Sequence, residues 1–235
     1  KQQINFKLTR SKKSQTQHSF IVAGDPQVID NNDCEKLKLV MSEIEKTASD
    51  IALKMPVHAI SMGDNVFDKL ELYDTYKQII AKTKIPFYQV LGNHDMDYNQ
   101  RSDELSAKSY TSKFGPAYYS FNIGHIHYVV LKDVFYYGYT YKYIGYITET
   151  QLSWLQKDLE TVAPGSTVIV SLHIPTVYGE SENSDNYATL LSNSVMNKNA
   201  LYKILAPYNT HILAGHSHTQ WNTIVSPKVF EHTHS

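Results

Sequence analysis

The chain has 235 residues, of which 42% are hydrophobic and 19% are charged, and its formal net charge at pH 7 is −1. This composition is typical of one globular α/β domain, and the near-neutral charge argues against nucleic acid as a partner. The single cysteine, Cys34, excludes an intramolecular disulfide. No apolar run reaches the roughly 18 residues that a membrane span needs, so no span is expected.

Apolar strands alternate with helical patterns in the first half of the chain. Residues 1–17 are polar and basic apart from INFKL at 4–8, and predict an N-terminal extension or an edge strand, followed by one domain over 18–235. The predicted strands are 18–25, 57–64 and 85–95, and the predicted helices are 33–55, with Asp33 as its N-cap, and 69–83. Such strand–helix repetition favours a largely parallel sheet.

The second half of the chain has a different order. The elements expected there are a hairpin at 115–133, a helix at 148–162, strands at 166–175 and 210–219, and a long surface loop at 176–200 that leads into a short helix. The tyrosine-rich run 136–146 predicts a half-exposed hairpin with its tyrosines on the wet face, in preference to an aromatic wall over a site. The final EHTHS is expected to be a truncated edge of the domain or of its neighbour rather than a second metal site. His58, His125, His127 and His211 are expected to be structural or surface residues.

Five apolar strands end in side chains that bind metals or transfer protons, and a glycine precedes the ligand in four of them. These side chains are Asp25, Asp64, Asn93 with His94, His173, and His216 with His218. Ligands of open α/β sheets bind beyond the carboxyl ends of the strands, so the five endings are expected to converge. Oxygen and nitrogen ligands without thiolate suit Mn, Fe, Zn or Ni. The set exceeds the needs of one tetrahedral zinc and fits two ions bridged by a carboxylate.

The ordered motifs resemble those of the calcineurin-like metallophosphoesterases across residues 19–219. They are GD at 24–25 and 63–64, GNHD at 92–95, His173 after an apolar strand, and GHSH at 215–218. GPAYYSF followed by QLSWLQKDL is similar to the purple acid phosphatase-like branch. The resemblance implies an α/β fold, a four-layer αββα sandwich of two mixed sheets with the metals at one edge.

The resemblance also implies a role for each residue. It places Asp25 and His218 on the first of two divalent metal ions, Asp64 between the ions, and Asn93, His173 and His216 on the second. His94 would lie beside the substrate phosphate as acid or electrostatic stabiliser, and the alternative for His94 is a residue that only orients its neighbours. The implied reaction is hydrolysis of a phosphomonoester, or of a diester, by in-line attack of a metal-bound hydroxide.

Gln27 is the first departure from the family pattern, which has histidine two residues after the first aspartate. Glutamine offers only an amide and cannot supply an imidazole nitrogen. A subset of the superfamily also carries this Asp-Pro-Gln sequence, so Gln27 is expected at the fourth ligand position of the first metal. A weaker ligand there predicts a labile first metal.

The GDxxD motif is the second departure. Phe67 stands where its second aspartate is expected, and Asp68 follows one residue later. Asp68 either supports His94 or caps the helix that begins at Lys69, and the cap is the favoured interpretation.

The sequence therefore favours a metal-dependent phosphoesterase acting on a small phosphorylated substrate or a phosphoprotein. The alternative is a non-catalytic module of the same fold that binds a phosphorylated ligand or protein through a partial metal site. Substrate specificity is expected to reside in the loops 97–114, 134–147 and 176–196. A periplasmic or secreted location is favoured over a cytoplasmic one, because the chain begins at Lys1 and similar bacterial proteins are often exported.

Overall fold

The computed structural model describes residues 13–139, 142–178 and 191–234. The predicted edge strand at 4–8 lies outside these residues, so the division into 1–17 and 18–235 stays a prediction. No helix of the described part of the chain is long and apolar enough to cross a membrane.

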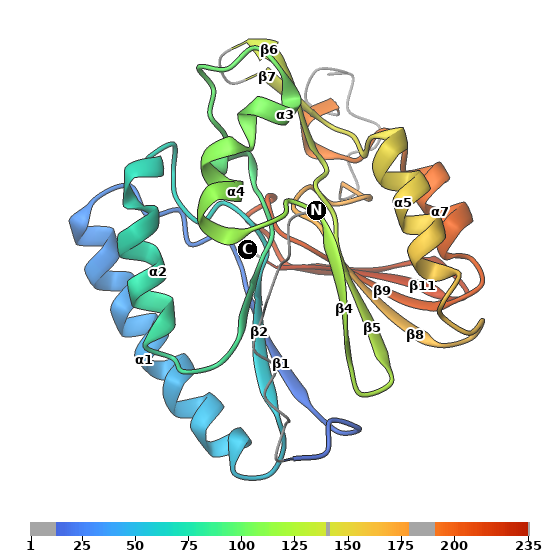
Figure 1. Ribbon diagram of the computed structural model, residues 1–235, viewed down its shortest axis with the longest axis horizontal. Coiled ribbons are helices and arrows are strands. Elements are labelled where there is room, and N and C mark those ends of the chain that lie inside the picture. The colour runs from blue at the N-terminus through green and yellow to red at the C-terminus, as the bar shows by residue number, and fades with distance from the viewer. Residues whose placement is uncertain (1–12, 140–141, 179–190, 235) are drawn as a thin grey trace, which may run out of the picture.

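Two sheets form the centre of the molecule (Figure 1). The smaller sheet has the order β1-β2-β3, with all described strands parallel: β1 (Ser19–Ala23), β2 (Val57–Ser61) and β3 (Phe87–Gln89). The larger sheet is mixed and has the order β10-β11-β9-β8-β5-β4. Its strands are β4 (Tyr119–Ile123), β5 (Ile126–Val130), β8 (Thr167–Ser171), β9 (Asn209–Ala214), β10 (Trp221–Ser226) and β11 (Val229–Thr233). A separate antiparallel hairpin pairs β6 (Val134–Tyr139) with β7 (Lys142–Gly145).

Helices cover the outer faces of both sheets. Figure 1 shows α1 (Asn31–Ala52) and α2 (Tyr73–Ala81) on one side of the molecule, and α5 (Glu149–Leu159) and α7 (Lys198–Leu205) on the other. Further helices of the described chain are η1 (Leu70–Leu72), η2 (Asn93–Asp95), α3 (Asp103–Ser106) and α4 (Lys108–Phe114), and residues 191–193 are also helical. This arrangement confirms the predicted four-layer αββα sandwich.

Three apolar clusters hold these layers together. Ile60, Val130 and Ile169 belong to the cluster between the two sheets. A second cluster joins α1 to α2, and a third packs α5 and α7 against the larger sheet. Each layer therefore buries an apolar face against the next layer, and both faces of each sheet are covered.

Four histidines outside the motifs, His58, His125, His127 and His211, are structural or surface residues, as predicted. His58 is buried between the sheets among aromatic rings, and this burial lowers its pKa to about 4. The ring of His127 lies 2.8 Å from Asp158, and that of His211 lies 3.0 Å from His232. His125 is exposed.

The predicted start of the first helix was wrong. Helix α1 begins at Asn31, and its N-cap is Asp30, which has an extended backbone and accepts a hydrogen bond from the Asp33 backbone at 2.9 Å. Asp33 instead lies in the first turn, where a carboxylate favours the positive end of the helix dipole. Near the end of the described chain, β11 lies between β9 and β10 and pairs with both, and the expectation that EHTHS is a truncated edge of the domain or of its neighbour stays a prediction.

The tyrosine-rich run forms the predicted hairpin, but its tyrosines are not all on the wet face. Tyr137 is exposed, whereas Tyr136 is buried and its hydroxyl donates to the backbone oxygens of Tyr98 and Gln100. Tyr143 faces His216, with ring centroids 6.2 Å apart. The inner face of the hairpin therefore borders the candidate site described next.

Candidate metal centre

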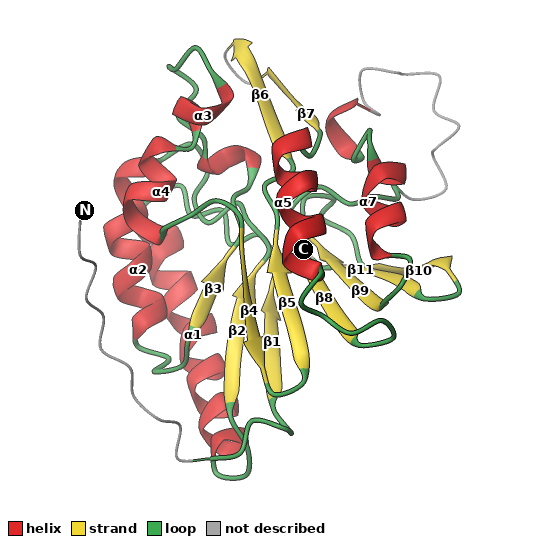
Figure 2. Cartoon of the chain, turned by 45° about the vertical axis from the view of Figure 1, so that its right-hand side comes forward, coloured by secondary structure: helices red, strands yellow, loops and turns green. Residues whose placement is uncertain are grey.

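The predicted ligands follow strands of both sheets and meet at one edge. Asp25 follows β1, Asp64 follows β2, and Asn93 and His94 belong to η2, which follows β3. These three parallel strands end at the same edge of the smaller sheet in Figure 2. His173 follows β8, and His216 and His218 follow β9 in the larger sheet. The centre therefore lies where the carboxyl ends of the two sheets come together, as expected for an α/β fold.

His173 is the most buried member of the cluster. Its Nδ1 lies 2.8 Å from the Met62 backbone oxygen, to which it donates, so Nε2 is the nitrogen left to bind a metal. This Nε2 is 3.3 Å from Asp64 Oδ1, 3.0 Å from Asn93 Oδ1 and 3.2 Å from His216 Nδ1. One ligand atom each from Asp64, His173 and His216 lies within 4.8 Å of the others, a spacing that suits one shared cation.

Gln27 lies on the other side of Asp64, beside His218 and Asp25. Its Nε2 is 3.0 Å from Asp64 Oδ2 and 3.0 Å from His218 Nε2. His218 Nε2 is 3.8 Å from Asp25 Oδ2, and its side chain is 60% exposed, whereas that of Asp25 is 2% exposed. The structure thus brings Asp25, Gln27 and His218 together with Asp64 in a group that is more open to solvent than the group around His173.

Glycines of the motifs make room for the carboxylates. A Cβ on Gly92 would lie 2.1 Å from Asp64 Oδ1, and a Cβ on Gly215 would lie 2.4 Å from Asp25 Oδ1. Four residues of the cluster have left-handed backbones: Gln27 (φ 43°), Asp64 (φ 49°), His216 (φ 70°) and His218 (φ 52°). Such strain in non-glycine residues concentrates at functional sites, where it aims side chains inward.

The electrostatics of the cluster fit a cation. Asp25 Oδ1 is buried without a hydrogen-bond partner, and burial raises the pKa of Asp25 to about 6. Burial alone would lower the pKa of His173, but Asp64, Asp25 and Asp133 raise it to about 10, so the imidazole takes up positive charge. In contrast, burial and the neighbouring His173 lower the pKa of His216 to about 3, so its ring is neutral. An unsatisfied buried carboxylate oxygen beside the neutral imidazole of His216 and the amide of Asn93 is a fitting donor set for divalent metal ions, and a bound cation would take the place of the proton on His173.

His94 is held beside this cluster by Asp68. Its Nδ1 is 3.0 Å from Asp68 Oδ1, its ring stacks on Phe67 at 3.9 Å between centroids, and its backbone nitrogen donates to Asp64 Oδ1 at 2.8 Å. Burial lowers the pKa of His94, but the Asp68 hydrogen bond and the Asp64 charge outweigh it and raise the pKa above the ordinary value.

The favoured interpretation of Asp68 as a helix cap was therefore wrong. The 3₁₀ turn η1 and helix α2 begin without a side-chain cap. Asp68 has a left-handed backbone with φ 57°, which turns its carboxylate toward the His94 ring.

Two further residues support the cluster and were not predicted. Asp133 is buried and accepts hydrogen bonds from the backbone nitrogens of His173 at 3.1 Å and Ile174 at 2.8 Å. Asn193 Oδ1 lies 2.9 Å from His216 Nε2. Asp133 follows an apolar strand, the same signal that identified Asp25 and Asp64, whereas no local pattern marks Asn193.

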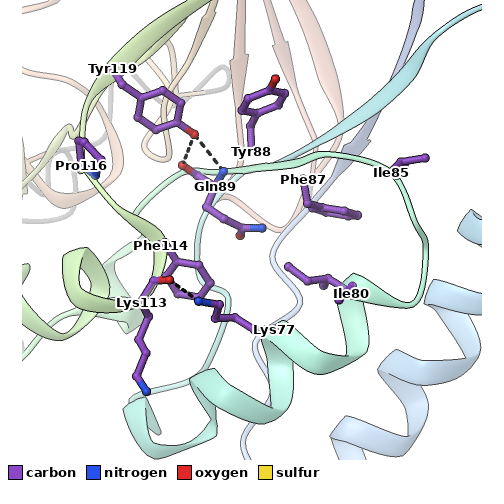
Figure 3. A pocket seen from close by; sticks show the side chains of 11 residues that line it. Lys77, Ile80, Ile85, Phe87, Tyr88, Gln89, Lys113, Phe114, Pro116 and Tyr119 are labelled. Atoms are coloured by element: carbon purple, nitrogen blue, oxygen red, sulfur yellow. Dashed lines mark hydrogen bonds between the residues drawn. The ribbon is translucent and has the colours of Figure 1, made fainter. Parts of the chain in front are cut away.

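A cavity of about 480 Å³ between α2, β3 and α4 differs in its chemistry from the ligand cluster at the strand ends (Figure 3). Its 11 lining residues include Lys77, Phe87 and Phe114, and none of them carries a carboxylate, imidazole or thiol. The hydroxyl of Tyr119 bonds the backbone of Gln89 along its edge, as the dashed lines show. This cavity lacks the groups that hydrolytic chemistry needs, so the candidate centre is the cluster at the strand ends.

The chain is similar to several known phosphatases. A family model described as calcineurin-like phosphoesterase matches residues 18–220. Purple acid phosphatase 15 of Arabidopsis thaliana is 28% identical over 150 residues, which cover 58% of this chain and 25% of that protein. The chain thus matches only about a quarter of that relative's length.

Two solved structures share the fold at low sequence identity. A dimetal phosphatase from Danio rerio superposes with a TM-score of 0.62 at 14% identity, covering 91% of this chain and 86% of that one. The purple acid phosphatase PPD1 from seeds of yellow lupin (Lupinus luteus) superposes with a TM-score of 0.63 at 14% identity, covering 94% of this chain and 44% of that one.

Proposed function

Because the chain belongs to the calcineurin-like phosphoesterase family, we propose that it is a metal-dependent hydrolase that cleaves phosphomonoesters, or alternatively diesters. The observation that carries this proposal is the convergence of Asp64, His173 and His216 on one point, with His94 beside them. The proposed substrates are small phosphorylated molecules or phosphoproteins, in preference to nucleic acids.

We propose two divalent ions, drawn from Mn, Fe, Zn and Ni. The first would be held by Asp25, Gln27 and His218, the second by Asn93, His173 and His216, and Asp64 would be shared. A flip of the Gln27 side-chain amide would present its oxygen to a cation, since the amide oxygen and NH₂ group are similar in shape. When bound, such metals activate a water as nucleophile for in-line attack and offset the charge of the phosphoryl oxygens.

His94 is proposed as the acid and electrostatic stabiliser. Asp68 occupies its Nδ1, which leaves Nε2 as the nitrogen available to a phosphoryl or leaving-group oxygen. The raised pKa of His94 favours the imidazolium, which can donate a proton to the departing oxygen. Asp68 fixes the orientation of the ring while it does so.

Turnover of nitrophenyl phosphate and bis(nitrophenyl) phosphate with added Mn²⁺ tests the proposed reaction. The expected result is metal-dependent hydrolysis, faster for the monoester, that chelation abolishes. The competing proposal is a non-catalytic module, which would bind metal without turnover. If elemental analysis shows a loaded centre and neither ester is hydrolysed with any of the four metals, the non-catalytic alternative is correct.

Gln27→His should make the first metal less labile. The imidazole is a stronger ligand than a neutral amide, and the solvent-exposed His218 leaves this side of the centre open to exchange. After dialysis against a weak chelator, we expect about one metal per wild-type chain and close to two per variant chain. Gln78→His on α2, outside the centre, is the matched control. Equal and full retention of both metals by the wild type contradicts this prediction.

A further inference from the structure

We propose that Asn193 is a positioning residue that orients His216 for the second metal. The proposal rests on the metal ligation proposed above and adds to it a residue outside the family motifs. Asn193 does not lie at a strand end, and it reaches the centre from the segment that connects the end of β8 to α7.

The hydrogen bond between Asn193 and His216 selects one form of the imidazole. His216 Nε2 is 2.9 Å from Asn193 Oδ1, and His216 Nδ1 is 3.2 Å from His173 Nε2 in the ligand cluster. An amide oxygen only accepts hydrogen bonds, so the ring nitrogen that faces it carries the proton. Nδ1 then has a free electron pair, which metal ligation requires.

Asn193 can orient the ring because the residues that follow it are fixed. Ser194 and Val195 are buried. The Ser194 hydroxyl donates to the Thr176 oxygen at 3.0 Å, and the Val195 nitrogen donates to the Pro175 oxygen at 3.0 Å. This segment is thereby tied to the chain just after His173.

A second tie joins the same segment to the hairpin. Val195 forms a parallel bridge with Gly145 of β7, and the Met196 nitrogen donates to the Gly145 oxygen at 2.7 Å. The approach is so close that a Cβ on Gly145 would lie 2.4 Å from the Ser194 oxygen. Since Tyr143 of the same strand meets the His216 ring at 82°, the hairpin and Asn193 confine the imidazole together.

The tautomer of His216 in the wild-type, metal-free protein is the first test. Long-range ¹H–¹⁵N spectra distinguish a proton on Nε2 from one on Nδ1, and His216→Gln assigns the signal by its loss. We expect the Nε2–H form in the wild type and a mixture of both forms in Asn193→Leu. A wild-type Nδ1–H tautomer would overturn the proposal.

Zinc affinity is the second test. Asn193→Leu removes the acceptor and should weaken Zn²⁺ binding at the second site by about 10- to 100-fold, the usual effect of losing such a partner. Asn193→Asp keeps an acceptor and should restore the affinity to within about threefold of wild type. Asn199→Leu, on an exposed asparagine of α7, is the matched control and should have no effect.

The remaining outcomes separate this proposal from the proposed reaction. If Asn193→Leu raises KM but leaves zinc affinity and tautomer unchanged, Asn193 binds substrate and the positioning role is wrong. If it lowers only the melting temperature, its role is structural and the proposal is likewise overturned. If zinc affinity falls as expected although the wild type hydrolyses no ester, the positioning role holds and the proposed function fails.

Discussion

Asp64→Asn is expected to reduce kcat/KM by about 10³-fold or more, close to the loss of all metal-dependent activity. Asp64 lies between the ligands of the two proposed metals: Oδ1 lies 3.3 Å from His173 Nε2, and Oδ2 lies 3.0 Å from Gln27. Asparagine keeps the shape but removes the negative charge and one of two ligand oxygens. Because a shared ligand serves both ions, its loss should lower the occupancy of both.

Steady-state kinetics and elemental analysis of the same preparation measure this effect. Asp74→Asn is the matched control, because Asp74 is an exposed carboxylate on α2 that pairs with Lys113. A variant of Asp64 that retains two metals and more than a tenth of wild-type activity would show that the carboxylate is not shared. Excess Mn²⁺ should recover little activity, because added metal cannot replace the missing carboxylate oxygen.

His94→Asn is expected to lower kcat by about 10²- to 10³-fold without loss of metal, the range found for removal of a general acid or one stabilising donor. The ring lies beside the cluster and is held by Asp68 and Phe67, so its replacement leaves the proposed side-chain metal ligands intact. The defect should be larger for an alkyl phosphate than for nitrophenyl phosphate, because nitrophenolate leaves without a proton.

This leaving-group dependence separates the two roles weighed for His94. If His94 is a general acid, the rate of the His94→Asn variant depends steeply on the leaving group. If His94 only orients its neighbours, kcat falls by the same factor for both substrates and the metal content changes. His125→Asn, at an exposed position in the turn between β4 and β5, is the control. Less than a tenfold change in kcat for both substrates contradicts a catalytic role for His94.

The sequence predicted the layered fold and the convergence of the motif residues because both depend on local patterns. An apolar run followed by glycine and a polar ligand marks a buried strand and its end, and parallel strands place such ends at one edge. Asp25, Asp64 and His173 were found in this way, and the structure brings them together. Their ligand roles stay predictions.

Features that depend on one backbone angle or on a distant segment were not predictable. Whether Asp68 caps a helix or supports His94 depends on a left-handed turn at that residue, which aspartate tolerates but which no sequence pattern requires at this position. Asn193 meets His216 only because its segment returns to the end of β8. Strand β10 is a half-exposed edge strand, so its apolar signal is weak.

The ligands of the centre come from both sheets of the sandwich. Asp25, Asp64 and Asn93 follow strands of the smaller sheet, whereas His173, His216 and His218 follow strands of the larger one. A cation bound between them would crosslink two layers whose interface is otherwise formed by an apolar cluster and a few hydrogen bonds. Metal affinity and the free energy of unfolding are then thermodynamically linked, so that a tenfold rise in free metal above its dissociation constant stabilises the folded chain by about 1.4 kcal/mol per site. The supply of metal would thus affect the thermodynamic stability of the fold as well as the proposed activity of the centre.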